Sequence, residues 1–68
     1  MSNVCNSMIY LSAFHQAVEN GDLQAVMEYV ESGMDINKEN KYGENAVYIA
    51  NMYGQWSILN YLRDHGGK

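Results

Sequence analysis

Apolar residues recur in this chain at helical spacing, in two blocks that follow the same order. The first block predicts a short helix over 12–19, with Ser12 as its N-cap and Gly21 as the residue that ends it. Asp22 can cap the next helix, and Gly33 suits the left-handed position that ends it. The apolar positions of these two expected helices are Ala13, Phe14, Ala17 and Val18, followed by Leu23, Val26 and Val30.

A polar, turn-rich stretch separates the two blocks. It spans 34–43 and offers a single candidate for burial, Ile36, so it predicts a short hairpin-like connector and not a helix. The second block then repeats the order of the first, with Asn45 as a cap and Gly54 as a break. Its apolar positions are Ala46, Val47, Ile49 and Ala50, followed by Trp56, Ile58, Leu59 and Leu62, and Gly66 and Gly67 end it.

The two blocks are related by a fixed period of 33 residues. Four pairs of identical residues keep this spacing, namely Gly21 with Gly54, Gly33 with Gly66, Ala13 with Ala46, and Ala17 with Ala50. A period in this range is typical of chains that stack one supersecondary unit on the next. We therefore expect an all-α solenoid, whose extended surfaces suit the binding of other proteins better than catalysis.

The composition of the chain excludes several further classes of protein. With 68 residues the chain forms one small domain, and its single cysteine, Cys5, excludes an internal disulfide framework and favours an intracellular, cytoplasmic setting without excluding the nucleus. No apolar run approaches the roughly 18 residues that a membrane-spanning helix needs, and the N-terminus does not have the pattern of a signal peptide. The sequence therefore predicts no contact with a membrane.

The net charge is −4, and the acidic residues gather in the first half of the chain. Five acids and no base lie between Glu19 and Asp35. Nucleic-acid binding needs clustered Lys and Arg, which the four bases of this chain do not supply, so we expect no nucleic-acid partner. Two interpretations of the acidic stretch stay open: a solvated face that maintains solubility, or a surface for a basic protein partner.

The chain resembles the ankyrin-repeat family over about residues 10–66. Gly33-Met34-Asp35-Ile36-Asn37 is close to the signature that closes a repeat in that family, and the spacing of the glycines agrees with it. The resemblance implies an ankyrin-repeat solenoid of two helix-turn-helix units joined by a β-hairpin-like loop. Residues 1–8 would be a flexible arm, and 9–68 a two-repeat domain with repeats at 10–42 and 43–68. Trp56 falls at a core position of the family, which implies packing.

Three features depart from the family pattern or vary between the repeats. The family's Thr-Pro pair is replaced by Ser12-Ala13 and Asn45-Ala46. Its loop-organising His is His15 in the first repeat and Tyr48 in the second. Arg63 stands where Val30 stands in the first repeat, which suits a terminal repeat with a solvent-facing side. Two interpretations of the length stay open, a complete two-repeat domain or a piece of a longer ankyrin-repeat protein.

No group of residues matches a catalytic or metal-binding pattern. His15 occupies the structural His position of the family, and Cys5 lies apart from both histidines. No nucleophile, base and orienting group share a motif. We therefore expect a protein that is not an enzyme and that binds neither a metal nor a cofactor.

The resemblance implies a non-catalytic protein-protein interaction module. Partners in the family contact the hairpin tips and the exposed side of each first helix, and the chain has six tyrosines and a tryptophan, which are residue types that anchor interfaces. The alternative is an assembly element that self-associates through its exposed repeat faces into a homo-oligomer. The candidate partner-binding residues are Glu19, Asn20, Lys41, Tyr42, Glu44, Met52, Tyr53 and Gln55.

Overall fold

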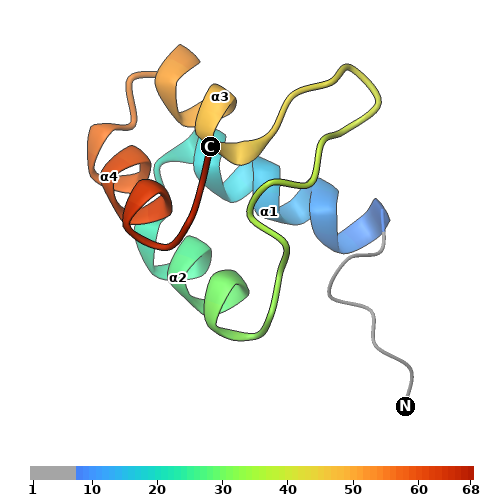
Figure 1. Cartoon of the computed structure of the whole chain (residues 1–68), viewed down its shortest axis with the longest axis horizontal. Coiled ribbons are helices and arrows are strands. Elements are labelled where there is room, and N and C mark those ends of the chain that lie inside the picture. The colour runs from blue at the N-terminus through green and yellow to red at the C-terminus, as the bar shows by residue number, and fades with distance from the viewer. Residues whose placement is uncertain (1–7) are drawn as a thin grey trace.

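The computed structural model describes residues 8–68 and places four helices in that range (Figure 1). They are α1 (Met8–Asn20), α2 (Leu23–Glu31), α3 (Ala46–Met52) and α4 (Trp56–Asp64). The expected all-α arrangement of two helix-turn-helix units is confirmed. Residues 1–7, which make up most of the predicted arm, lie outside the described part of the chain.

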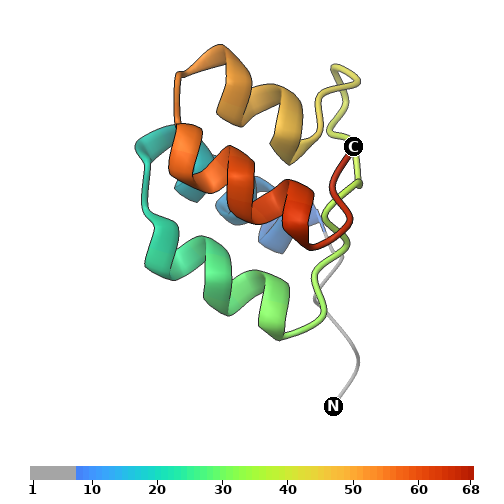
Figure 2. The same cartoon turned by 60° about the vertical axis from the view of Figure 1, so that its left-hand side comes forward.

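The four helices form two layers. Within each repeat the two helices pack against each other, α1 on α2 and α3 on α4. Between the repeats, α1 packs on α3 and α2 packs on α4, so α1 and α3 form one layer and α2 and α4 the other (Figure 2). The small side chains Ala46 and Ala50 of α3 are completely buried, which lets its backbone approach its neighbours closely.

One capping arrangement ends all four helices. After α1, for example, the Gly21 amide donates to the Val18 carbonyl and the Asp22 amide donates to the Ala17 carbonyl, which is the Schellman pattern. This pattern requires a residue with positive φ, which glycine adopts without steric cost. It explains why glycine recurs at the predicted helix ends.

The predicted start of the first helix is wrong, whereas the two other predicted caps are confirmed. The Asp22 carboxylate accepts from the Ala25 amide at 3.2 Å, and the Asn45 side chain accepts from the Tyr48 amide at 2.9 Å. Ser12, by contrast, lies inside α1, which begins at Met8.

Helix α1 extends upstream of Ser12 because its buried stripe does. Leu11, Phe14 and Val18 fall at i, i+3 and i+7 and are all almost fully buried. Leu11 therefore adds a turn of core packing ahead of the expected cap. No proline interrupts the helix at the position after Ser12, which Ala13 occupies.

The connector between the repeats is a turn without a strand ladder. The structure assigns no strand to residues 8–68, so the connector is hairpin-like in its turn and not a hairpin of two paired strands. The tip is nevertheless hairpin-like, because the Gly43 amide donates to the Asn40 carbonyl at 3.0 Å and the Asn40 amide donates to the Glu44 carbonyl at 2.9 Å. Met34 is buried as well as Ile36, so the connector is fixed to the core at two points and not at one.

Trp56 contradicts the expectation that it packs in the core. It is 59% exposed and lies at the first position of α4. Its equivalent in the first repeat, Leu23, is only half-buried, so this position lies at the edge of the core. The indole of Trp56 is larger than the leucine side chain, and most of its surface is exposed to solvent. It lies near the turn between α3 and α4, where a Cβ added at Gly54 would come within 3.7 Å of it.

Gln55 connects the turns of the two repeats. Its Nε2 donates to the Glu19 carbonyl at 2.9 Å, and its amide group lies where a Cβ on Gly21 would stand, with Oε1 2.8 Å from that position. Gly21 has φ +77°, which itself favours glycine.

We expect Gly21→Ala to cost more stability than Gly33→Ala. Both residues have positive φ, so each substitution carries a backbone cost of about 1 kcal/mol or more. Only Gly21→Ala also displaces Gln55 and breaks its hydrogen bond, which adds about 1 kcal/mol. Urea denaturation followed by circular dichroism measures both values. In a Gln55→Ala background, Gly21→Ala and Gly33→Ala should cost the same stability. A larger cost of Gly21→Ala in that background would refute this explanation.

Candidate functional site

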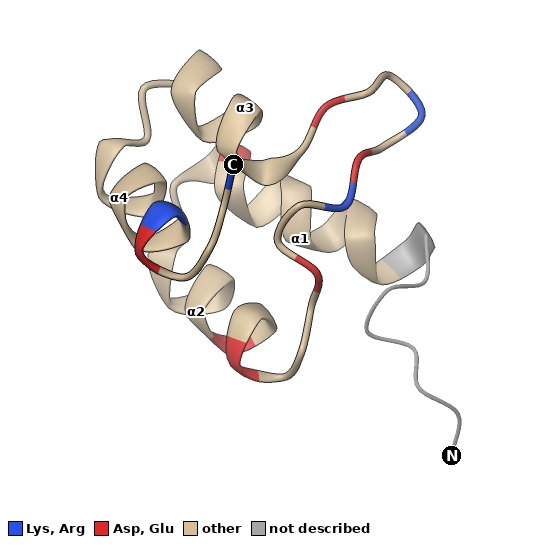
Figure 3. Cartoon of the chain, in the orientation of Figure 1, with Lys and Arg blue, Asp and Glu red and all other residues tan. Residues whose placement is uncertain are grey.

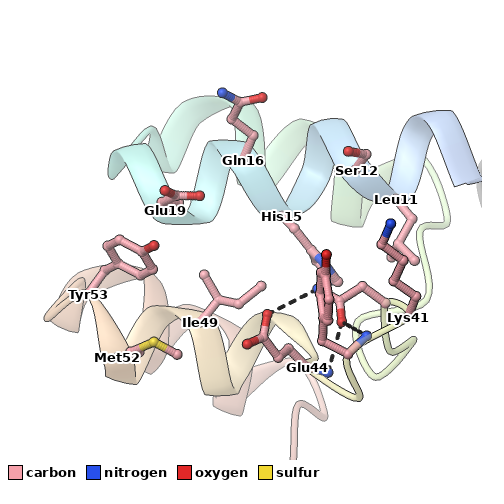
Figure 4. Close-up of a pocket in the computed structure, with 12 residues that line it drawn as sticks. Leu11, Ser12, His15, Gln16, Glu19, Lys41, Glu44, Ile49, Met52 and Tyr53 are labelled. Atoms are coloured by element: carbon pink, nitrogen blue, oxygen red, sulfur yellow. Dashed lines mark hydrogen bonds between the residues drawn. The ribbon is translucent and has the colours of Figure 1, made fainter.

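A groove of about 570 Å³ runs between α1 and α3 and is bounded at one end by the connector (Figure 4). Helix α1 provides one wall, helix α3 the other, and residues 40–44 the end. The first helices of both repeats therefore share one surface. The residues that line it are Leu11, Ser12, His15, Gln16 and Glu19 from α1, Asn40, Lys41, Tyr42 and Glu44 from the connector, and Ile49, Met52 and Tyr53 from α3 and its C-cap.

The structure brings six of the eight predicted binding residues together in this groove. They are Glu19, Lys41, Tyr42, Glu44, Met52 and Tyr53. Asn20 is exposed at the end of α1, and Gln55 is engaged with the Glu19 carbonyl, so neither belongs to the lining. The role of all eight residues in binding stays a prediction.

Sequence reasoning missed the other six lining residues, although four of them carried a signal. Residues that lie three, four or seven positions apart share one face of a helix. This spacing relates Ser12, His15 and Gln16 to the candidate Glu19, and it relates Ile49 to the candidate Met52. Leu11 and Asn40 do not stand at these spacings from a predicted residue of the same helix, so the sequence does not single them out.

Asn40 holds the connector end of the groove in a fixed shape. Its Oδ1 accepts from the Tyr42 amide at 2.9 Å and from the Glu44 amide at 3.0 Å, and its Nδ2 donates to Glu44 Oε1 at 3.1 Å (Figure 4). The loop tip is therefore organised by one side chain. As a result, the Glu44 carboxylate is oriented before any partner arrives.

Glu19 and Tyr53 form the opposite end of the groove. The hydroxyl group of Tyr53 faces the Glu19 carboxylate, whose hydrogen-bonding capacity and negative charge raise the pKa of Tyr53 above its ordinary value. These two side chains face each other across the groove, one from α1 and one from the end of α3.

His15 is the most buried polar side chain at the groove, with 6% of its surface exposed. Burial lowers its pKa, while a hydrogen bond to the Lys38 carbonyl and the charge of Glu44 act in the opposite direction with smaller effect. Its Nε2 is buried without a hydrogen-bond partner. The ring is therefore neutral at pH 7.

We expect the domain to lose stability as the pH falls below about 6.5, the ordinary pKa of histidine. In the unfolded chain His15 takes up a proton near that pH, whereas in the folded protein it resists protonation until its own, lower pKa. The stabilising effect is complete above about pH 6.5 and is lost progressively as the pH falls toward the folded-state pKa. Urea midpoints between about pH 7.5 and 5.5 measure this loss.

Two variants distinguish the contribution of His15 to this pH dependence from the contributions of other groups. His15→Gln should flatten the pH dependence across this range. His65→Gln, which removes an exposed histidine, measures what the other histidine contributes to the same curve. The explanation fails if His65→Gln flattens the curve and His15→Gln does not.

Exposed aromatic and thioether side chains surround the groove. Tyr42 is 74% exposed and Tyr53 52% exposed, and Met52 is about equally open to solvent. The Lys41 ammonium group lies 5.4 Å from the centroid of the Tyr42 ring, which is within cation–π range. The groove thus combines apolar anchors with two carboxylates, and this chemistry suits non-covalent binding.

The charges are distributed unevenly over the fold. Acidic and basic residues both occur along the connector, whereas α2 carries acids alone (Figure 3). Within residues 8–68, no three His, Cys, Asp or Glu side chains come together as a metal site would require. In the same range, no helix has the length and apolar character needed to cross a bilayer.

Comparison with known proteins identifies the family. A model described as ankyrin repeats in many copies matches residues 14–63. Myotrophin from Xenopus tropicalis is 38% identical over 53 residues, which make up 78% of this chain and 45% of that protein, so the chain spans less than half the length of this relative. A search of solved structures gave no significant match. The predicted resemblance is thus confirmed, and the chain belongs to the ankyrin-repeat family.

Proposed function

We propose that this protein is a non-catalytic interaction module that binds a partner protein in the groove between α1 and α3. Ankyrin repeats generally serve protein-protein interaction, which supports the class of function. The observation that carries the proposal is the pair of exposed tyrosines, Tyr42 and Tyr53, at opposite ends of a groove that is already formed. Tyrosine buries a large area with little loss of conformational entropy, so it is enriched where proteins bind each other.

In this proposal each predicted residue has a role that its position allows. Tyr42, Met52 and Tyr53 supply apolar contact, while Glu19 and Glu44 select a partner with a basic surface. Lys41 lies at the rim beside Tyr42. Asn20 and Gln55 would contact a partner only if it extends past the groove toward the turns of the two repeats. We place this activity inside the cell, in keeping with the single cysteine of the chain.

A double substitution tests the proposal. We expect Tyr42→Ala with Tyr53→Ala to weaken partner binding by roughly tenfold or more, because each truncated anchor at such a site commonly costs about 1 kcal/mol or more. The partner would be captured from a lysate of the native host with the immobilised wild-type domain and quantified by mass spectrometry against the variant.

Tyr48→Ala is the matched control, because Tyr48 is also an exposed tyrosine but lies outside the groove lining. A partner that is depleted by the double variant and retained by the control supports the proposal. Equal recovery on all three proteins contradicts it. All three should first show the same far-ultraviolet circular dichroism spectrum.

Self-association is a second candidate, favoured by the apolar surface outside the groove. Tyr48 and Trp56 are both more than half exposed. Tyr48 occupies the repeat position that His15 holds in the first repeat, where the neighbouring repeat buries it. Size-exclusion chromatography with light scattering over a range of concentrations tests this candidate, and a constant mass of 7.7 kDa would exclude it.

A further inference from the structure

Two carboxylates, those of Glu19 and Glu44, line the groove, against one ammonium group, that of Lys41. The hydrogen bond that the structure gives the Glu44 carboxylate comes from the neutral amide of Asn40, which does not balance the carboxylate charge. The Glu19 carboxylate likewise faces a neutral group, the hydroxyl of Tyr53. An ionised carboxylate has about four acceptor positions, so both groups can accept further donors.

His15 lies beneath the connector end of the groove. It is more than nine-tenths buried, its ring extends from α1 toward the connector (Figure 4), and its Nε2 has no hydrogen-bond partner. This atom lies under the same end of the groove as Glu44, whose charge acts on the ring.

Apolar surface separates the two carboxylates. The side chain of Ile49 lies between the Glu19–Tyr53 pair and Glu44, and Met52 stands beside it on the same helix (Figure 4). Glu44 precedes the N-cap of α3 and Tyr53 is its C-cap, so eight helical steps separate the two caps. At about 1.5 Å per residue, the two caps lie about 12 Å apart along the helix, with Glu44 next to the first cap and Glu19 facing the second.

An extended peptide matches this spacing. Its side chains on one face recur every second residue, so residues i and i+4 lie about 13 Å apart and residue i+2 falls between them. Basic residues at i and i+4 would meet the two carboxylates, and an apolar residue at i+2 would rest on Ile49 and Met52. An anionic segment would instead meet two like charges, and Lys41 is the single Lys or Arg in the lining.

On the basis of the proposed function, we infer that the groove binds an extended segment of a partner protein in which two basic residues, four positions apart, flank a central apolar residue. The ammonium or guanidinium groups pair with Glu19 and Glu44, and the central side chain packs on Ile49 and Met52. Arginine suits both ends best, because its guanidinium group has five donors and also stacks on tyrosine rings.

Three synthetic peptides test this inference against the whole 68-residue chain. The first is acetyl-Gly-Arg-Ser-Leu-Ser-Arg-Gly-amide, which carries the proposed spacing. The second replaces both arginines by citrulline, which keeps the shape and removes the charge. The third has the composition of the first in the order Gly-Arg-Arg-Leu-Ser-Ser-Gly, which keeps the charge and changes the spacing. Dissociation constants come from nitrogen-15 NMR titration, which also reports whether each variant is folded.

The first peptide should bind at least about fivefold more tightly than the other two. Glu19→Gln and Glu44→Gln should each weaken it about threefold, as expected for partly exposed charge pairs. Lys41→Gln should strengthen it, because a like charge leaves the rim. Glu28→Gln with Glu31→Gln, which removes two acids from α2 outside the groove, should leave its affinity within about twofold of wild type.

Equal affinities for the three peptides, no binding up to millimolar concentration, or an equal loss with the α2 variant would each overturn the inference. These results differ from a failure of the proposed function. If the peptides fail while a captured partner still depends on Tyr42 and Tyr53, the groove binds a partner of other chemistry. If that dependence is absent as well, the groove is not the interaction site.

Discussion

Replacing Phe14 by alanine is expected to unfold most of the protein at room temperature. Phe14 is fully buried in α1 and meets the ring of Tyr29 edge to face, with 5.9 Å between the ring centroids. Phe→Ala in a core typically costs about 3–5 kcal/mol. A domain of this size has a total stability of about 3–10 kcal/mol, so this substitution removes much or all of it. Far-ultraviolet circular dichroism with increasing urea measures the loss.

A graded variant keeps this prediction measurable if Phe14→Ala does not fold. Phe14→Leu retains most of the apolar volume and should lower the urea midpoint without abolishing the transition. Tyr42→Ala, at the exposed tip of the connector, is the control and should change the midpoint little. A Phe14→Ala protein as stable as the wild type would refute the assignment of Phe14 to the core.

Replacing Ala50 by leucine is expected to destabilise the protein by about 1–3 kcal/mol. Ala50 is completely buried in α3, which packs against both α1 and α4, so the added atoms of the larger side chain have no space to occupy. Either the helices move apart or the new side chain leaves its preferred rotamer. Thermal unfolding followed by circular dichroism measures the effect.

The next residue of the same helix supplies the control. Asn51 is exposed, so Asn51→Leu adds a leucine to the same turn without entering the core. Its midpoint should stay near that of the wild type. Comparable losses from both substitutions would mean that helix α3 does not approach its neighbours as closely as the structure indicates.

The sequence allowed much of the fold to be predicted, because its strongest signals act locally. Positive φ at Gly21 and side-chain caps at Asp22 and Asn45 follow from the chemistry of a few adjacent residues. The start of α1 could not be found in this way. Ser12 has the chemistry of a cap, and only the burial of Leu11 against the rest of the protein shows that the helix begins earlier.

The exposure of Trp56 shows a second limit of what can be predicted from the sequence. A family position indicates that a residue borders the core, but it does not indicate how much of an indole fits there. Leu23 is half-buried at the equivalent place, and the larger side chain remains mostly outside.

The groove could be predicted in part. The predicted residues of the connector and of α3 line it together with Glu19. The hydrogen bonds of Asn40, which fix the shape of the connector, and the unpaired Nε2 of His15 depend on contacts between side chains in the folded protein. No pattern in the sequence reports such contacts.

Mapping the partner-bound surface by nitrogen-15 NMR tests the central claim most directly. The labelled protein would be titrated with the partner recovered by capture, and the shift of each backbone amide signal would be recorded. We predict that the largest changes fall on residues of the groove, from Leu11 to Glu19, Asn40 to Glu44 and Ile49 to Tyr53. Changes concentrated on α2 and α4, with the groove signals unmoved, would contradict the proposal that this groove is the interaction site.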